Sequence, residues 1–103
     1  MYRVELLPGA IADLMEIREY VASDSDSDAV AEKLMDKLDK KMQQLELFPE
    51  SGKLLRERYM VSNSYRFVVC EKYMIFYRFA NDVVTIVRVI YGRRDFLRIL
   101  FPR

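Results

Sequence analysis

The first half of the chain carries apolar residues at helical spacing, after a short alternating segment. Residues 2–7 (YRVELL) alternate loosely and end at Pro8, which predicts a first strand. Pro8 suits the first turn of a helix, where its missing N–H costs nothing. Apolar residues then recur every three or four positions at Ile11, Leu14, Ile17 and Val21, so we predict an amphipathic helix that ends near Ala22.

A second helix is predicted from the polar segment SDSDSD, residues 23–28, whose side chains can cap a helix N-terminus. The helix is expected to start near Ser27 and to stop at Phe48-Pro49. Its apolar positions are Val30, Leu34, Leu38, Met42 and Leu45. The two helices are therefore expected to form an antiparallel hairpin with these stripes in the core.

The second half of the chain has the pattern of strands. Residues 65–70, 73–79 and 83–91 are rich in aromatic and β-branched residues and are separated by short polar turns, which predicts a three-stranded antiparallel meander. Both parities of 83–91 are apolar, as expected for a central strand covered on both faces. Residues 54–63 show no regular pattern, and the tail is expected to add a helical turn whose Phe96, Ile99 and Leu100 pack on the body.

The order strand, helix, helix, strand, strand, strand predicts an α+β fold, an antiparallel sheet with an N-terminal helical hairpin packed on one face. The other face of the sheet is left open by these elements. Residues 1–103 are expected to form a single domain, because a chain of this length leaves no room for a second.

The composition of the chain indicates in which cell compartment the protein is expected to act. The apolar runs are far shorter than the ~20 residues that span a bilayer, and the N-terminus mixes charges into its apolar residues, so neither a membrane segment nor a signal peptide is expected. The single cysteine, Cys70, fits a reducing cytoplasm and is expected to be an inert packing residue. We expect no metal site and no cofactor.

Charge divides the chain into two unlike halves. Residues 1–50 hold 6 Lys/Arg and 12 Asp/Glu, net −6, whereas residues 51–103 hold 11 Lys/Arg and 4 Asp/Glu, net +7. Of the 11 cations in the second half, 9 are arginine, whose planar fork suits phosphate or carboxylate. The split suggests a nucleic acid or an acidic protein as a partner.

Several blocks together resemble the RelE/ParE superfamily of bacterial type II toxin–antitoxin toxins. They are YRVELLPGAIADLMEIREYVA at the start, LELFPESG after the second helix, YRF, KYMIFYRF, and VTIVRVIYGRRDF near the end. The resemblance covers nearly the whole chain, and the last two blocks in their spacing are the specific part. It implies the same β-α-α-β-β-β order that the patterns predict.

The resemblance implies one of two activities. RelE-type toxins are metal-independent, ribosome-dependent endoribonucleases that cut mRNA, and ParE-type toxins inhibit DNA gyrase. Cleavage through the 2′-OH requires a base, an acid and a cation on the developing charge. By resemblance Arg66 and Arg94 would hold phosphate and Tyr91 would serve as acid or base, but Met74 stands where RelE-type enzymes hold arginine, and the chain has no histidine. These departures favour the ParE-type branch.

For a ParE-type toxin we expect the target to be bound by Arg78, Arg93, Arg94 and Arg98. A cognate antitoxin, contributing an acidic segment, a helix and a strand, is expected to contact Met15, Tyr20, Phe48 and Arg66. The partners are then this antitoxin and either DNA gyrase or the ribosome with mRNA.

Simpler structural roles are weighed beside these. Arg93 and Arg94 could cap a strand end or pair with Asp95, and Arg66 could be a solvated arginine on the open sheet face if Phe67 faces the helices. Arg88, in the central strand, is expected to form a structural ion pair with Glu16 or Glu19. A non-toxic nucleic-acid-binding module is the second alternative for the whole chain.

Overall fold

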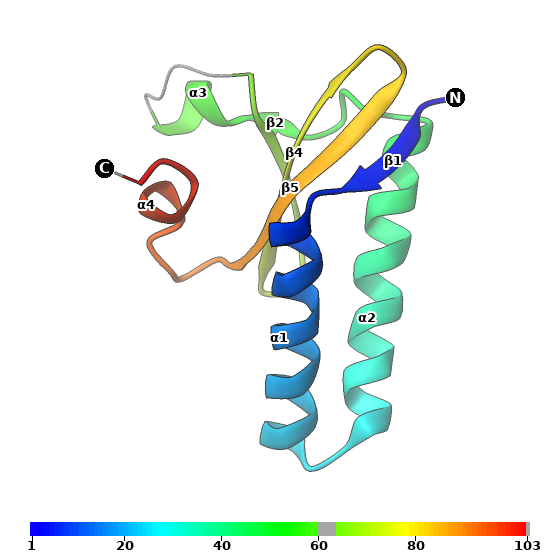
Figure 1. The fold of residues 1–103 in the computed structure, drawn as a ribbon, viewed down its shortest axis with the longest axis vertical. Helices are drawn as coiled ribbons and strands as arrows, with labels where there is room; N and C mark the ends of the chain where they lie inside the picture. Colours follow the sequence, from blue (N-terminus) through cyan, green and yellow to red (C-terminus); the bar gives the residue numbers. More distant parts are fainter. Residues whose placement is uncertain (60–63, 103) are drawn as a thin grey trace.

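A five-stranded mixed sheet forms the middle layer of the molecule, with strand order β1-β5-β4-β3-β2 (Figure 1). The computed structural model describes residues 1–59 and 64–102. The strands are β1 (Arg3–Leu6), β2 (Lys53–Leu54), β3 (Arg66–Cys70), β4 (Tyr73–Ala80) and β5 (Val83–Tyr91). The α+β class and the predicted meander of β3, β4 and β5 are confirmed.

The helical hairpin consists of α1 (Pro8–Ser25) and α2 (Asp28–Gln43), followed by the short 3-10 helix η1 (Gln44–Glu46). Pro8 occupies the first turn of α1, and Asp26 ends that helix in a left-handed conformation, φ 52°. Ser27 is the N-cap of α2, where its Oγ accepts a hydrogen bond from the backbone N–H of Val30 at 3.2 Å. The predicted start of the second helix is thus confirmed.

The turn between β4 and β5 is built by Asn81 and Asp82, both with positive φ, 52° and 65°. Two consecutive positive φ values match the right-handed twist of a tight hairpin, and Asn and Asp tolerate them better than most residues. Further along, β5 carries a bulge opposite Phe76 and Tyr77. Before the bulge the even-numbered residues of β5, such as Ile86, face the hairpin, and after it the odd-numbered residues, such as Val89, do so.

The sheet departs from the prediction at both edges. The predicted all-antiparallel sheet is wrong, because β1 pairs with β5 in parallel, Arg3 opposite Val83 and Leu6 opposite Ile86. The segment 54–63 was expected to be irregular, but it contributes the end of β2 and the helix α3 (Leu55–Tyr59). These elements are too short to show a period, and residues 60–63 of that segment lie outside the described residues.

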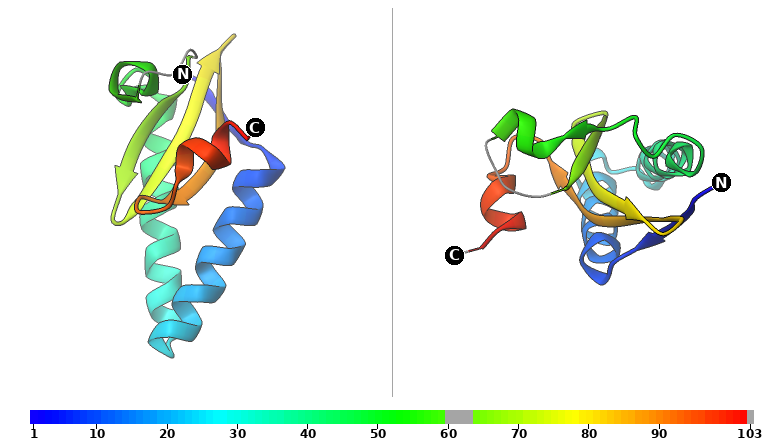
Figure 2. Two further views of the ribbon diagram at one scale, coloured as in Figure 1. Left: turned by 90° about the vertical axis from the view of Figure 1, so that its left-hand side faces the viewer. Right: turned by 90° about the horizontal axis from the view of Figure 1, so that it is seen from above.

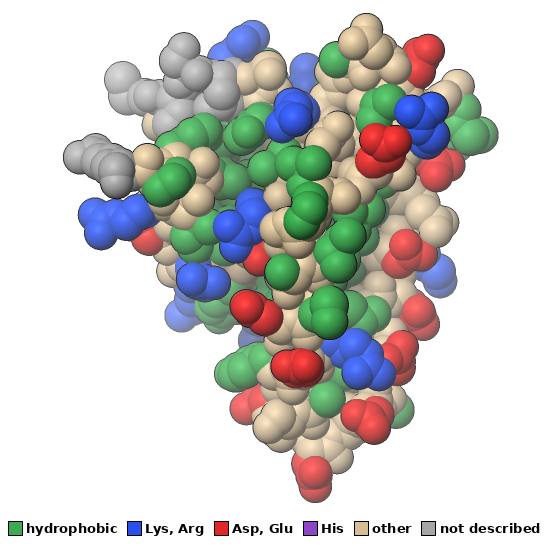
Figure 3. Space-filling view, in the orientation of Figure 1, with side chains coloured by type: hydrophobic (Ala, Val, Ile, Leu, Met, Phe, Trp, Pro, Cys, Tyr) green, Lys and Arg blue, Asp and Glu red, His purple; other side chains and the backbone are tan. Residues whose placement is uncertain are grey.

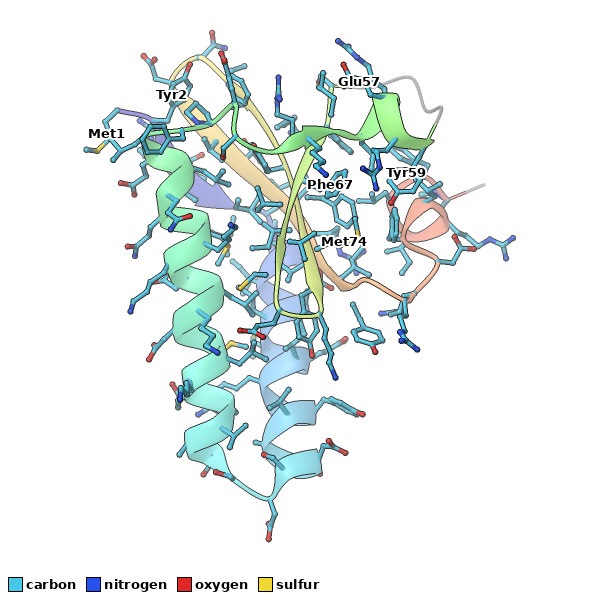
Figure 4. The ribbon with its side chains drawn as sticks, turned by 180° about the vertical axis from the view of Figure 1, so that it is seen from behind. Met1, Tyr2, Glu57, Tyr59, Phe67 and Met74 are labelled. Atoms are coloured by element: carbon cyan, nitrogen blue, oxygen red, sulfur yellow. The ribbon has the colours of Figure 1, made fainter. Side chains whose placement is uncertain are left out.

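Two apolar cores lie on opposite faces of the sheet (Figure 2). The hairpin covers one face, with Leu38 and Leu45 packed on residues such as Tyr77 and Ile86. On the other face α3 and the C-terminal helix α4 (Phe96–Leu100) cover Phe67, Met74, Phe76 and Ile90, and Figure 4 shows Phe67, Met74 and Tyr59 on this side.

The expected open face is therefore wrong, since the chain covers this face itself with α3 and α4. The predicted helical turn of the tail and the central, doubly covered last strand are confirmed. Within the part of the chain that the structure describes, no helix is long and apolar enough to cross a membrane.

Candidate functional site

The turn between β5 and α4 presents the arginines of the YGRRDF block. Gly92 N–H donates to the carbonyl of Lys72 at 2.9 Å, and Arg94 N–H donates to the carbonyl of Tyr91 at 3.0 Å, which fixes the turn to the β3–β4 hairpin. Asp95 caps α4 by accepting from Arg98 N–H at 3.4 Å. Arg93 and Arg94 are exposed, and neither forms an ion pair with any residue of 1–59 or 64–102.

Asp95 pairs with Arg98 rather than with Arg93 or Arg94. The Arg98 Nε lies 3.6 Å from Asp95 Oδ2, with both side chains exposed, so the pair is weak. The guanidinium of Arg78, also exposed, stands 5.9 Å from the ring centre of Tyr65. All four residues predicted to bind a target are thus on the surface.

These arginines belong to a larger set that we call the arginine surface. It comprises Arg56 and Arg58 of α3, Arg78 of β4, Arg93 and Arg94 of the turn, and Arg98 of α4, all exposed. The α3 pair was missed from the sequence because residues 54–63 showed no element that could place them. Its only sequence signal is the local density of basic residues in LLRERY.

A groove of about 690 Å³ opens between the hairpin and the end of the sheet where β4 begins and β5 ends. Three tyrosines from different elements line it, Tyr20 of α1, Tyr73 of β4 and Tyr91 of β5, so we call it the tyrosine groove. On the hairpin side the apolar side chains Ile17, Val21, Val30 and Leu34 line it together with the charged residues Asp13, Glu16, Asp24, Lys33 and Lys37. Arg94, Lys72 and Glu71 stand at the sheet side. The hairpin extends beyond the sheet here (Figure 1).

Tyr73 of the groove is suited to contact rather than to proton transfer. The rings of Tyr73 and Tyr91 meet edge to face, with centroids 5.9 Å apart. Burial raises the pKa of Tyr73, and the neighbouring Tyr20 and Tyr91 raise it further. The Tyr73 phenol therefore stays neutral at physiological pH.

Arg66 is held by the loop after the hairpin. Its Nη1 donates to the carbonyls of Gly52 at 2.8 Å and Glu50 at 3.2 Å, and its guanidinium lies 5.6 Å from the ring centre of Phe79. Phe67 faces the core under α3 and α4, so Arg66, the adjacent residue along the strand, lies on the face that the hairpin covers. The expectation that Arg66 lies on the face away from the hairpin is wrong. Arg66 acts as a loop anchor in this structure.

The three candidate catalytic residues do not form one cluster. Tyr91 and Arg94 both line the tyrosine groove, but Arg66 does not. Along β4, Arg66 is opposite Tyr77 and Tyr91 is opposite Tyr73. Arg66 and Tyr91 are therefore separated by four residues along the strands and by two strand spacings across the sheet, which places their Cα atoms about 16 Å apart. This is too far for both residues to act on one phosphate.

Arg88 forms the expected structural ion pair, but with a different partner. Its Nε and Nη2 donate to the carboxylate of Asp13 at 2.6 and 2.7 Å, and this bond raises the pKa of Arg88. Asp13 also accepts from Val89 N–H at 2.9 Å, on the edge of β5 just past the end of β1. Glu16 and Glu19, the predicted partners, are exposed on α1.

The three apolar residues predicted to bind an antitoxin lie on different surfaces. Tyr20 lines the tyrosine groove. Met15 is 62% exposed but, five positions earlier, points about 140° away around α1. Phe48, 64% exposed, follows η1 at the opposite end of the hairpin. Only Tyr20 is thus placed beside the β5–α4 turn.

A model of the family described as "ParE toxin of type II toxin-antitoxin system, parDE" matches residues 4–96. The chain belongs to the ParE toxin family. The match includes the tyrosine groove and the YGRRDF turn, and it ends at Phe96. It confirms the resemblance to the superfamily and its closeness to the ParE-type branch.

A solved structure, "Chromosomal ParDE TA system from P. aeruginosa", has the same fold. It superposes with a TM-score of 0.74 at 17% sequence identity, over 88% of this chain and 96% of that chain. A search of curated proteins gave no match. As a member of the ParE toxin family, the chain is the toxin component of a type II toxin–antitoxin system, and its partner is a cognate antitoxin.

Proposed function

We propose that this ParE-family toxin acts in the cytoplasm by inhibiting DNA gyrase, and that it does so by binding rather than by catalysis. The observation that carries the proposal is the family match over residues 4–96, because the ParE-type branch that the sequence resembles inhibits gyrase. The arginine surface, which includes Arg93 and Arg94 of the turn before α4, supplies the target-binding residues. Cleavage of mRNA is disfavoured by the distance of Arg66 from Tyr91 and by its bonds to Glu50 and Gly52.

We further propose that the antitoxin places an apolar helix face in the tyrosine groove and an acidic segment over Arg93 and Arg94. The groove offers apolar and aromatic side chains along a length of α1 and α2, which is the usual ground for an amphipathic helix. Its rim at Lys72 and Arg94 is continuous with the arginine surface. One antitoxin segment could therefore cover both surfaces.

The test of the target uses purified toxin in a gyrase supercoiling assay. Wild type is expected to inhibit supercoiling of relaxed plasmid, and Arg93→Ala/Arg94→Ala is expected to lose at least tenfold in inhibition. Lys40→Ala/Lys41→Ala is the matched control, since it also removes two cations, but from the last turn of α2 in the hairpin on the other face of the sheet. An inhibition lost equally in both variants would assign the effect to folding rather than to the arginine surface.

A parallel test addresses the alternative activity. Primer extension on a reporter mRNA in a bacterial cell-free translation extract should give the same products with and without the toxin. Ribosome-dependent cuts that disappear in Arg94→Ala would overturn gyrase as the target.

The antitoxin surface is tested by affinity for the cognate antitoxin. Tyr20→Ala should weaken the complex by about 1–2 kcal/mol, typical of an aromatic side chain at an interface, whereas Met15→Ala should have a smaller effect. The opposite order would move the antitoxin helix out of the tyrosine groove.

A further inference from the structure

The arginine surface is continuous across two short helices that are far apart in sequence. The ring of Tyr59, at the end of α3, meets the ring of Phe96, at the start of α4, with centroids 5.2 Å apart. Tyr65 stacks on Phe101 at 5.8 Å, and Arg78 lies over Tyr65. These contacts bring α3, β4 and α4 together on the face of the sheet opposite the hairpin (Figure 2).

The face of the sheet that α3 and α4 cover carries mostly positive charge. On β2, α3, β4, α4 and the turn before α4, the exposed cations among the described residues are the six members of the arginine surface and Lys53, and the exposed acids are Glu57 and Asp95. Within residues 1–59 and 64–102, Arg56, Arg58, Arg93 and Arg94 form no ion pair. Figure 3 shows the basic side chains gathered over α4 and its preceding turn, whereas acidic ones predominate over the hairpin.

Two observations decide which polyanion fits. No described residue of α3 or α4 is among the large apolar side chains that are exposed. Val69 of β3, opposite Met74 on the same face of the sheet, is 55% exposed, but a single valine is too little for the apolar centre of a protein interface. Its aromatic rings pack on one another in the second core and offer no platform for the stacked bases of a single strand. The remaining exposed groups are the guanidinium groups of the arginine surface, whose planar shape and positive charge suit the phosphates of a double helix.

We propose that the toxin binds duplex DNA directly, without sequence preference, through the arginine surface, with α3 contributing as much as the turn before α4. The choice of DNA over duplex RNA rests on the proposed function, since gyrase holds a DNA duplex. The acidic hairpin would then point away from the DNA and leave the tyrosine groove accessible from the side. The toxin would reach gyrase on its DNA substrate rather than free in solution.

The expected salt dependence follows from the number of phosphate contacts. If about five of the seven cations each neutralise one phosphate, the logarithm of affinity falls against the logarithm of salt concentration with a slope of about −4.5. A rise from 50 to 200 mM salt then weakens binding by roughly 500-fold. Loss of two contacts reduces the slope by about 2 and the affinity at 100 mM salt by roughly 10- to 60-fold.

The experiment measures fluorescence anisotropy of a labelled 20-base-pair duplex with the full-length toxin and no gyrase present. The decisive variant is Arg56→Gln/Arg58→Gln on α3, compared with Arg93→Gln/Arg94→Gln. The matched control is Lys40→Gln/Lys41→Gln, which removes the same charge from the last turn of α2. Circular dichroism and thermal unfolding verify that each variant is folded before its affinity is compared.

The proposal predicts binding of the duplex by wild type, similar losses in the two arginine variants, and little loss in the lysine control. It is overturned by no binding at 50 mM salt, by equal losses in all three variants, or by binding of a single-stranded 20-mer or polyglutamate as tight as that of the duplex. Tighter binding of duplex RNA than of duplex DNA would also overturn it. DNA binding without inhibition of supercoiling would remove only the proposed function, and inhibition without DNA binding would remove only this inference.

Discussion

Replacing Asp13 by alanine is expected to destabilise the fold more than any other single change to a charged side chain of α1. Asp13 is the one buried charged residue among those that the structure describes, and it accepts three hydrogen bonds, two from Arg88 and one from Val89 N–H. It stands at the point where β1 has ended and the edge of β5 would otherwise be unpaired. The carboxylate thus completes the sheet edge and attaches α1 to it.

The magnitude can be estimated from these bonds. Val89 is 2% exposed, so its N–H would lose its partner without access to bulk water, at a cost of about 2 kcal/mol. The Arg88 side chain is 30% exposed and can recruit water, which limits its loss to about 1 kcal/mol. The sum is about 3 kcal/mol, which lowers the melting temperature of a domain of this size by about 12 °C.

Urea unfolding and differential scanning calorimetry measure both quantities. Asp13→Asn should fall between wild type and Asp13→Ala, because its amide oxygen can still accept from Val89. Glu16→Ala is the matched control, since it removes the same charge one turn later without a bond to Arg88, and it should change stability by less than about 0.5 kcal/mol. A loss below 1 kcal/mol in Asp13→Ala, or an equal loss in the Glu16 control, would refute the assigned role.

Three substitutions and one reaction-rate measurement test other parts of the structure. Tyr77→Phe removes a buried hydroxyl that donates to Pro49 O at 2.7 Å and accepts from Gly52 N–H at 2.9 Å, and should cost about 2–3 kcal/mol in urea unfolding. Gly52→Ala would place a Cβ 2.4 Å from that hydroxyl and 2.9 Å from the carbonyl of Phe67, so we expect a loss of about 2 kcal/mol or more by the same measurement. Arg66→Ala should lower stability by about 1–2 kcal/mol and leave inhibition of supercoiling unchanged; loss of inhibition in folded protein would add Arg66 to the target-binding residues. Burial, followed by the charge of Glu71, raises the pKa of Cys70, so its reaction with a thiol reagent at pH 8 should be slower than that of a short peptide with the same residue, and a midpoint in the rate-against-pH profile at or below the peptide's would contradict this.

The main elements could be predicted because each repeats its pattern over several residues. Both hairpin helices and the meander have enough turns or alternations to show a period, and their start and stop signals, such as Ser27 and Asn81-Asp82, carry their own chemistry. β2 and α3 could not be predicted, since two and five residues are too few to establish a period. The parallel pairing of β1 was also hidden, because alternation indicates a strand but not the direction of its neighbour.

The candidate site was harder to predict because it depends on which face each side chain takes. In YRFVVC both parities are apolar, so the pattern could not show that Phe67 faces α4 and that Arg66 faces the loop after the hairpin. The sequence did contain a signal that Asp13 is the partner of Arg88. Asp13 lies three residues after Ala10 and four before Ile17, on the apolar stripe of α1, whereas Glu16 and Glu19 lie off it.

The sheet explains how a division of charge along the sequence becomes a division in space. The acidic half of the chain ends shortly after the hairpin, and the hairpin lies on one face. The helices α3 and α4 and the turn before α4 carry five of the eight exposed arginines among the described residues. They belong to the basic half, and the two helices cover the other face. The meander between α3 and α4 is apolar enough to fill both cores, so it separates the two charged layers without neutralising either. The toxin therefore presents opposite potentials to partners on its two sides, and an acidic antitoxin segment that reaches the arginines from the tyrosine groove would cancel the side that a polyanionic target needs.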